Sequence, residues 1–371
     1  MDREESIWSV SRVLVLVIPF GAALLFVAAY YIAVAAGAAM NSAAVVSGFL
    51  RYLLGGITSF VPFSMYEFLI VLLGAFALYS LAAGTVSIVR SKGRRIFTAF
   101  SRFLPLVTAA VFIWAAFLWL WCSLYYTAPF YEGVLTNSTP SEDELAFALE
   151  YFVEGANEYA PQVSRDNGGH ITESAGTLLS RAAEVIPYDK FCAYFPRLVN
   201  YPSPRPKGMI FSEFMSATHF TGVYFALTGE ANVNRGTPKC FLPSTAAHEL
   251  AHAHGIAPEA EANFAGIIAA SLSGDAAFRY SGFLLGVTEL GNALYSANPD
   301  RYVELSQNFS ELVRIDFGDN HEYWAQYEET RAVTAVNSAY DGYLKSNGQQ
   351  LGIKSYGACV NLLAEWVKVC V

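Results

Sequence analysis

Long uninterrupted runs of apolar residues dominate the first third of the chain. The run Val13–Ala36 is free of charge and long enough to cross about 30 Å of hydrocarbon. Two further apolar runs cover Phe68–Val89 and Phe103–Tyr126, and the second is rich in Trp and Tyr near its end, as expected at a membrane interface. The pattern predicts three transmembrane helices, at about residues 13–36, 68–89 and 103–126.

The first run differs from a cleaved signal peptide, because the residues before it include acidic side chains and its apolar stretch exceeds the usual length. We therefore expect residues 1–126 to form a retained multi-pass anchor in a lipid bilayer. The loop Arg90–Arg102 holds five basic residues and no acidic one, which favours a cytoplasmic position. The N-terminus is then cytoplasmic, and everything after Tyr126 is extracytoplasmic.

Charge separates the chain into two unlike parts. Residues 1–126 contain eight basic and four acidic side chains, whereas the remaining residues contain 15 basic and 28 acidic ones. Only 15% of the whole chain is charged, which is low for a soluble domain. The net charge of -9 has the wrong sign for a nucleic-acid partner. The sequence predicts an anchor followed by an acidic outer domain, residues 127–371.

Periodicity in the outer domain predicts mainly helices with some strand. Residues 141–160 and 172–186 have the pattern of amphipathic helices, and Ser141 begins a capping box before the first of them. The Pro-rich segment Tyr201–Gly208 cannot be helical, and Gly222–Thr228 has the pattern of a strand. The fold class expected here is α+β and mainly helical.

The clearest chemical signal is an HExxH motif formed by His248, Glu249 and His252. Positions i and i+4 of a helix lie on one face, so both imidazoles can bind one zinc ion. Glu249 is then beside the metal, where it can accept a proton from an activated water and pass it to a leaving amine. These residue types at this spacing predict metal-assisted hydrolysis of a peptide bond.

A catalytic zinc also needs a third protein ligand and an open position. Gly255 can end the first helix, and Pro258 suits the start of a second. Two carboxylates follow, and we favour Glu259 over the alternative Glu261, because Glu259 precedes Asn263 by four residues in the E-x-x-x-D/N pattern of gluzincins. In that pattern Asn263 supports a ligand histidine.

Two other histidines and one tyrosine are weaker candidates. His254 points off the ligand face and is expected to support the site without binding metal. His219 and Tyr224 are placed to donate a hydrogen bond to a developing oxyanion, although both residue types are more often packing or surface groups.

Four of the five cysteines fall in the outer domain. They allow three pairings, of which Cys192–Cys240 with Cys359–Cys370 is the most local, and reduced buried thiols are an equal alternative. None has a C-x-x-C metal spacing.

Several short elements occur in an order that resembles a known family. They are Pro204-Arg-Pro-Lys207, Thr228–Asn234, HELAH, Glu259–Phe264, Tyr343–Gly348 and Lys354–Gly357. Together they look like a bacterial family of unknown function, integral membrane proteins with a P-R-P-K motif. The resemblance covers nearly the whole chain and implies a gluzincin-type, zincin-like domain on an anchor in a bacterial cell membrane. The E-x-E-A-N-F element is also similar to that of metallopeptidases that cleave phage immunity repressors.

This resemblance implies that Gly222–Asn234 contains the strand beside the active-site helix. Such a strand pairs with a peptide or protein substrate in extended form, through main-chain hydrogen bonds. Gly222 and Tyr224 lie on this strand. Glu230, Asn232 and Asn234 are expected to line the same cleft, or alternatively to cap turns.

The sequence therefore predicts a membrane-anchored zinc metallopeptidase with no assigned substrate. The alternative is a non-hydrolytic assembly or sensing protein with a structural zinc. A structural zinc site would not need the carboxylate of Glu249. A transporter is disfavoured, because the three spans contain no intramembrane charge pair.

Overall fold

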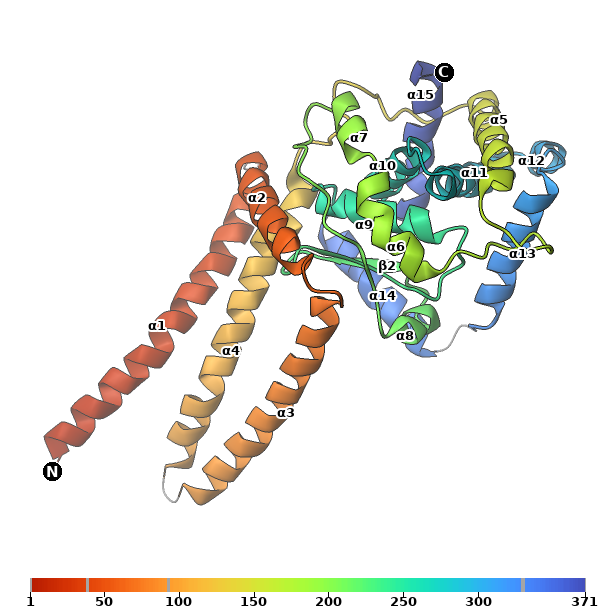
Figure 1. The fold of residues 1–371 in the computed structure, drawn as a ribbon. Coiled ribbons are helices and arrows are strands. Elements are labelled where there is room, and N and C mark those ends of the chain that lie inside the picture. Colours follow the sequence, from red (N-terminus) through yellow and green to blue (C-terminus); the bar gives the residue numbers. More distant parts are fainter. Residues whose placement is uncertain (1, 38–39, 92–93, 328–330, 371) are drawn as a thin grey trace. The chain divides into compact units, whose positions relative to one another are not determined.

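The computed structural model describes residues 2–37, 40–91, 94–327 and 331–370, most of which are helical (Figure 1). The chain divides into two compact units. The first comprises Met1–Ser47 and Tyr66–Thr127, and the second comprises Gly48–Met65 and Ala128–Val371. The segment Gly48–Met65 precedes the boundary predicted at residue 127, so the second unit is built from two separate stretches of chain.

The first unit holds the apolar helices. They are α1 (Asp2–Ala35), α3 (Met65–Arg90), α4 (Arg95–Leu120) and the short η1 (Cys122–Tyr126). Among the described residues, three stretches are long and apolar enough to cross a membrane, namely Val13–Ala35, Met65–Arg90 and Arg95–Tyr126. The prediction of three apolar helices capable of spanning a membrane is thus confirmed. The third stretch begins earlier than predicted, at Arg95 instead of Phe103, because the helix includes basic residues that the sequence assigned to the preceding loop.

Helix α2 (Asn41–Thr58) was not predicted. It lies between the first two predicted transmembrane helices, at about residues 13–36 and 68–89. Its first residues belong to the first unit, and the rest, from Gly48 to Thr58, belongs to the second.

The second unit is a helical domain with one small sheet. Its helices and helical turns are α5 (Glu142–Tyr159), η2 (Ala160–Gln162), α6 (Ala175–Val185), α7 (Tyr188–Tyr194), α8 (Ser212–Ala217), α9 (Leu242–Ala253), α10 (Glu259–Ser271), α11 (Ala276–Ala297), α12 (Pro299–Ser306), α13 (Glu311–Ala325), α14 (Arg331–Ser346), η3 (Gly352–Cys359) and α15 (Val360–Cys370). The two amphipathic helices predicted before residue 187 correspond to α5 and α6.

Local sequence signals account for several of these boundaries. The side chain of Ser141 accepts a hydrogen bond from the Glu144 backbone N–H, and the Glu144 carboxylate accepts one from the Ser141 backbone N–H, which is the predicted capping box at the start of α5. The Pro-rich segment is not helical and ends in the two-residue strand β1 (Lys207–Gly208).

Three strands form the sheet, in the order β1-β3-β2. The predicted strand appears as β2 (Gly222–Phe225), which pairs antiparallel with β3 (Glu230–Val233), and β3 pairs parallel with β1. Every residue of β3 is buried. Strand β2 is at an edge of the sheet, so one of its two sides is free of strand pairing within the described part of the chain.

The cysteines of the second unit are separate thiols wherever the structure describes them. Cys192, Cys240 and Cys359 are each buried and free, so the local pairing Cys192–Cys240 is not formed. The side chain of Cys370 lies outside the described residues. Burial raises the pKa of the Cys192 thiol to about 11, which keeps it protonated and unreactive.

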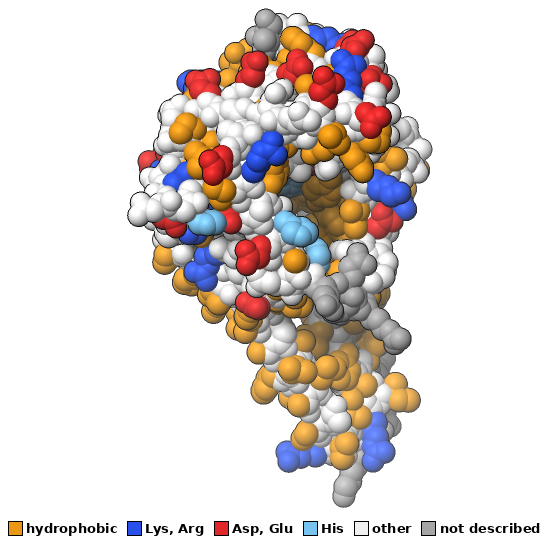
Figure 2. All heavy atoms as spheres, turned by 90° about the vertical axis from the view of Figure 1, so that its right-hand side faces the viewer, with side chains coloured by type: hydrophobic (Ala, Val, Ile, Leu, Met, Phe, Trp, Pro, Cys, Tyr) orange, Lys and Arg blue, Asp and Glu red, His pale blue; other side chains and the backbone are white. Residues whose placement is uncertain are grey.

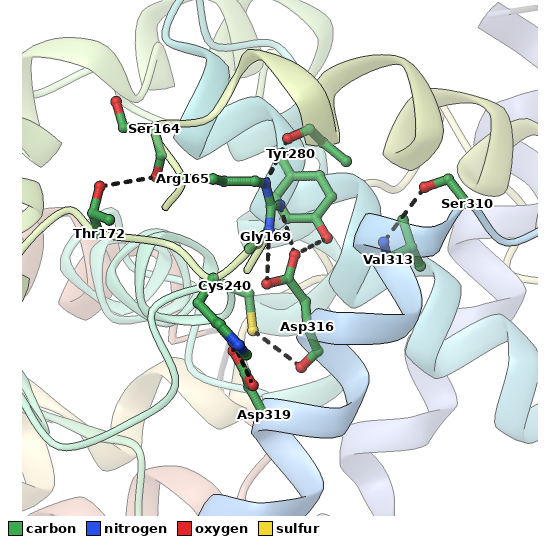
Figure 3. Close-up of polar contacts among 12 residues, drawn as sticks. Ser164, Arg165, Gly169, Thr172, Cys240, Tyr280, Ser310, Val313, Asp316 and Asp319 are labelled. Atoms are coloured by element: carbon green, nitrogen blue, oxygen red, sulfur yellow. Dashed lines mark hydrogen bonds and ion pairs between the residues drawn. The ribbon is translucent and has the colours of Figure 1, made fainter. Parts of the chain in front are cut away.

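A buried ion pair ties the loop after η2 to helices α11 and α13 (Figure 3). The Arg165 guanidinium donates to both carboxylate oxygens of Asp316, at 3.1 and 2.7 Å, and the Tyr280 hydroxyl also donates to this carboxylate. The two charged side chains are only 7% and 2% exposed. A buried charge pair of this kind fixes the relative positions of the elements that carry it. Removing one partner leaves the other charge buried without a counter-ion.

We therefore expect Asp316→Ala to destabilise the domain by about 3–5 kcal/mol, because Arg165 loses its buried counter-ion. Asp319 is a matched control one turn along α13, since it pairs with an exposed histidine, His170. Thermal unfolding of the purified full-length protein checks this. Equal melting temperatures for Asp316→Ala and Asp319→Ala would contradict the role assigned to the buried pair.

Candidate metal centre

Helix α9 carries the HExxH residues, and they are buried in the domain. Every residue from Leu242 to His252 is buried. The rings of His248 and His252 lie 4.7 Å apart between centroids, with their planes at 87°. The helical spacing therefore places both imidazoles on one face, as the motif predicts.

The turn after α9 returns the chain to this face. Gly255 has a φ of +97°, a conformation that favours glycine, and its N–H donates to the His252 carbonyl at 3.0 Å. The Ile256 carbonyl accepts a hydrogen bond from His252 Nδ1 at 2.7 Å, which leaves Nε2 of that ring directed at the next helix. Pro258 precedes α10, whose first residue is Glu259. The predicted helix end and helix start are both present.

Glu259 meets both histidines. Its Oε2 lies 3.3 Å from His248 Nε2 and 3.4 Å from His252 Nε2, and the three ligand atoms lie within 4.8 Å of one another. Tetrahedral ligands at 2.0–2.1 Å from zinc are separated by about 3.3 Å. Two neutral imidazoles and one carboxylate are also a donor set that zinc commonly takes. The residues present thus fit a zinc ion in both spacing and chemistry.

The charge state of Glu259 depends on this arrangement. Burial alone would raise its pKa, but His252 and His248 together hold the pKa of this carboxyl well below its usual range. Its Oε1 accepts a hydrogen bond from the Tyr340 hydroxyl at 2.6 Å, while Oε2 is buried with no hydrogen-bond donor among the described residues. A carboxylate oxygen in that position is available to a cation.

Glu261, the alternative third ligand, lies elsewhere. It is not part of the three-residue cluster, and its carboxylate interacts with the Phe130 backbone N–H. Burial raises its pKa to about 7. Of the two carboxylates left open by the sequence, the structure brings Glu259 to the histidines.

Glu249 lies between the cluster and the first residue of β2. A Cβ atom at Gly222 would collide with its carboxylate, so the absence of a side chain at position 222 makes room for it. Burial, together with the charge of Glu259 and against that of His248, raises the pKa of Glu249 to about 8. Its Oε2 has no hydrogen-bond partner within the described chain.

A cavity of about 400 Å³ opens beside these groups, and Figure 2 shows a hollowed face with histidine side chains next to the opening. His248, Glu249 and Gly222 line it. Tyr340 and Tyr356, which the sequence did not single out as site residues, also line it. The Tyr356 ring stacks on His248 with centroids 5.9 Å apart, and its hydroxyl lies 3.2 Å from that of Tyr340.

Asn263 lines the cavity beside this cluster, but its contacts differ from those that the sequence analysis expected. Its side-chain amide donates to the Tyr356 carbonyl at 3.2 Å and to Glu289 Oε1 at 3.5 Å. His248 Nδ1 is buried without a hydrogen-bond partner among the described residues. Asn263 therefore joins α10 to η3 and α11, and no hydrogen bond from it to a histidine is recorded.

His254 packs away from the metal cluster. Its ring stacks on Tyr188 at 4.3 Å, and its Nε2 lies 3.0 Å from the Ser203 hydroxyl. Burial, helped by the charge of Arg51, lowers the pKa of His254 to about 4, so this ring is neutral at physiological pH. It supports the end of α9 structurally.

The two candidate oxyanion donors lie in different surroundings. His219 is exposed at the cavity, has a φ of +60° and stacks on Trp324 with centroids 5.5 Å apart. Tyr224 is buried and does not line the cavity. Its ring lies between His252, at 6.3 Å, and the Arg51 guanidinium, at 5.9 Å.

The polar residues predicted to line the substrate cleft are directed into the domain instead. Glu230 forms a buried ion pair with Lys207 and accepts hydrogen bonds from Thr228 and the Met65 N–H. Asn234 donates to the Ser216 hydroxyl at 2.8 Å, and Asn232 is buried in β3. None of Glu230, Asn232 and Asn234 lines the cavity. Glu230 and Asn232 belong to a fully buried strand, where polar side chains must find internal partners. Asn234 follows that strand and caps a turn, as the alternative expected, because its Oδ1 accepts a hydrogen bond from the Gly236 N–H at 2.9 Å.

Arg51, which the sequence analysis did not select, closes the C-terminal end of α9. Its Nη1 donates to the carbonyls of His252 at 2.9 Å and Ala253 at 3.3 Å, and the side chain is buried. A cation at a helix C-terminus is favourable, because the last carbonyls lack intrahelical partners. One feature of the sequence could have pointed to Arg51, since it is the only charged residue between Arg12 and Glu67.

The same segment makes further contacts within the second unit. The Lys207 ammonium donates to the Thr58 carbonyl at 2.7 Å, and the Thr58 hydroxyl donates to the Thr228 carbonyl at 3.1 Å. Tyr52 stacks on Tyr201 with centroids 4.9 Å apart. The lysine of the P-R-P-K motif thus joins the last residue of α2 to the sheet.

The fold and site define a chain with three apolar helices able to span a membrane and a helical domain that carries a buried cluster of two histidines and one glutamate. Residues 44–364 match a family model described as "Protein of unknown function (DUF3810)". The chain belongs to this family. No curated protein and no solved structure matches the chain.

We expect Arg51→Met to destabilise the second unit by about 1.5–3 kcal/mol, because it removes a charged donor from two buried carbonyls. Tyr52→Phe is the matched control, since it keeps the aromatic stack on the same helix. The measurement is thermal unfolding of the full-length protein. A melting temperature for Arg51→Met equal to that of Tyr52→Phe would show that Arg51 does not hold α9.

Proposed function

We propose that this protein is a membrane-anchored, zinc-dependent metallopeptidase with a gluzincin-like, zincin-type outer domain. The observation that carries the proposal is the buried cluster of His248, His252 and Glu259 beside a cavity that Glu249 also lines. A buried carboxylate and two imidazoles within ligand distance are a costly arrangement unless a cation joins them. A cavity with perturbed titratable groups is where chemistry is expected.

His248 and His252 would hold zinc through Nε2, and Glu259 through Oε2. A zinc ion bound there lowers the pKa of water to about 7 and polarises a carbonyl oxygen. The remaining chemistry belongs to the protein. Glu249 takes a proton from the attacking water and delivers it to the leaving amine, and its position against Gly222 fixes the carboxylate for both transfers.

Strand β2 is suited to hold an extended peptide. It is an edge strand of the sheet, and its first residue, Gly222, lines the cavity beside Glu249. Main-chain hydrogen bonds along such an edge give affinity for a peptide without requiring a particular sequence. The hydroxyl of Tyr356, also in the cavity lining, is a neutral donor for a developing oxyanion, whereas that of Tyr340 already donates to Glu259.

The location that fits this function is a bacterial plasma membrane, with the outer domain extracytoplasmic. Support comes from the three apolar helices and from the basic loop between the last two. The substrate is then a peptide or a protein segment that is accessible outside the cytoplasm.

Replacing Glu249 by Gln should keep zinc bound and lower peptide hydrolysis at least about 100-fold, because the side chain can no longer carry the proton. The assay is digestion of a peptide library by the purified full-length protein, with products identified by mass spectrometry and zinc measured in parallel. Glu261→Gln is the matched control, because this second buried carboxylate does not line the cavity.

Full activity of Glu249→Gln would contradict the mechanism. A zinc-loaded wild-type protein that hydrolyses no member of the library would favour the alternative, a structural zinc in an assembly or sensing protein.

A further inference from the structure

The cavity has a second carboxylate, separate from the proposed machinery. Helix α11 directs Leu285, Thr288 and Glu289 to it, at the i, i+3, i+4 spacing of one helical face. Glu289 is outside the cluster of His248, His252 and Glu259, so its carboxylate is not one of the candidate metal ligands. It also comes from a different helix than Glu249.

The charges around the cavity are one-sided. Among the residues that the structure describes, its lining includes the carboxylates of Glu249 and Glu289 and no lysine or arginine. Among the described residues, Glu289 has no ion-pair partner, and its recorded hydrogen bond is the long one from Asn263, at 3.5 Å. Burial, opposed by the charge of His248, raises the pKa of Glu289 to about 7.

A mostly buried carboxylate with one weak donor is poorly compensated, and a cation entering the cavity would compensate it. The side-chain amides of Asn320 and Asn337 also line the space and offer oxygen acceptors. The volume of about 400 Å³ lies within the range of small-ligand pockets and leaves room for a long side chain.

We propose that the cavity selects peptides with a cationic group, an arginine or lysine side chain, next to the bond that is cleaved, and that Glu289 is the residue that recognises it. This inference rests on the proposed peptidase function. A free N-terminal amine offers the same chemistry, and acetylation of the peptide distinguishes the two sources.

The test is equilibrium binding of fluorescent peptides to the zinc-loaded, full-length Glu249→Gln protein, which is expected not to consume them. Two N-acetylated peptides differ at one position, arginine in one and citrulline in the other, so that shape is kept and charge is lost. A third peptide contains citrulline and a free N-terminus. The arginine peptide should bind at least about tenfold more tightly than its citrulline counterpart.

Adding Glu289→Gln to the same protein should abolish this preference, while adding Glu261→Gln should preserve it. The control is close, because burial raises the pKa of Glu261 to about 7 as well, yet Glu261 does not line the cavity. A preference for the free N-terminus in place of the arginine side chain would still support recognition of a cation by Glu289, provided that Glu289→Gln removes it.

Equal binding of all three peptides would overturn the inference and leave the peptidase proposal standing, because peptides would still bind. A preference that survives Glu289→Gln would also overturn it. Failure of every peptide to bind, in a protein that also lacks zinc, would instead count against the proposed function itself.

Discussion

The carboxylate of Glu259 must be neutralised where it lies, and this requirement organises the second unit. It is buried between two imidazoles of α9, and an uncompensated charge in such a position would cost several kcal/mol. The chain meets the requirement with a tight turn after α9, which brings the first residue of α10 back to the histidines. The packing of α9 and α10, the hydrogen bond from His252 to Ile256 and the contact from Tyr340 all serve this one location.

The rest of the domain holds that turn in place from several directions. Arg51 binds the last carbonyls of α9, and His254 stacks on Tyr188 beside it. The Lys207–Glu230 pair fixes the sheet to the last residue of α2. A stretch between two helices that are long and apolar enough to cross a membrane is therefore part of the domain that carries the cluster, and the domain is not built from the C-terminal sequence alone.

Sequence periodicity was sufficient for the apolar helices, for α5 and α6, and for the strand β2, because each has a local signal. The HExxH spacing was likewise sufficient to place His248 and His252 on one face. Whether Glu259 or Glu261 approaches these histidines depends on the path of the turn before the glutamates. Both glutamates follow the same turn, so the sequence alone does not decide between them. Arg51, Tyr340, Tyr356 and Glu289 reach the site from distant elements, and no local pattern encodes such contacts. The family resemblance placed Glu230, Asn232 and Asn234 at the cleft or in turn caps. Glu230 and Asn232 are instead buried in β3, and Asn234 caps the turn after it.

The most direct test of the central claim is the zinc content of purified full-length protein, compared between wild type, Glu259→Ala and Glu261→Ala. We predict one zinc per chain in wild type and in Glu261→Ala, and at least a tenfold loss of zinc affinity in Glu259→Ala, because only Glu259 lies within ligand distance of both histidines. Zinc lost only from Glu261→Ala, or absent from the wild-type protein after zinc loading, would contradict the account.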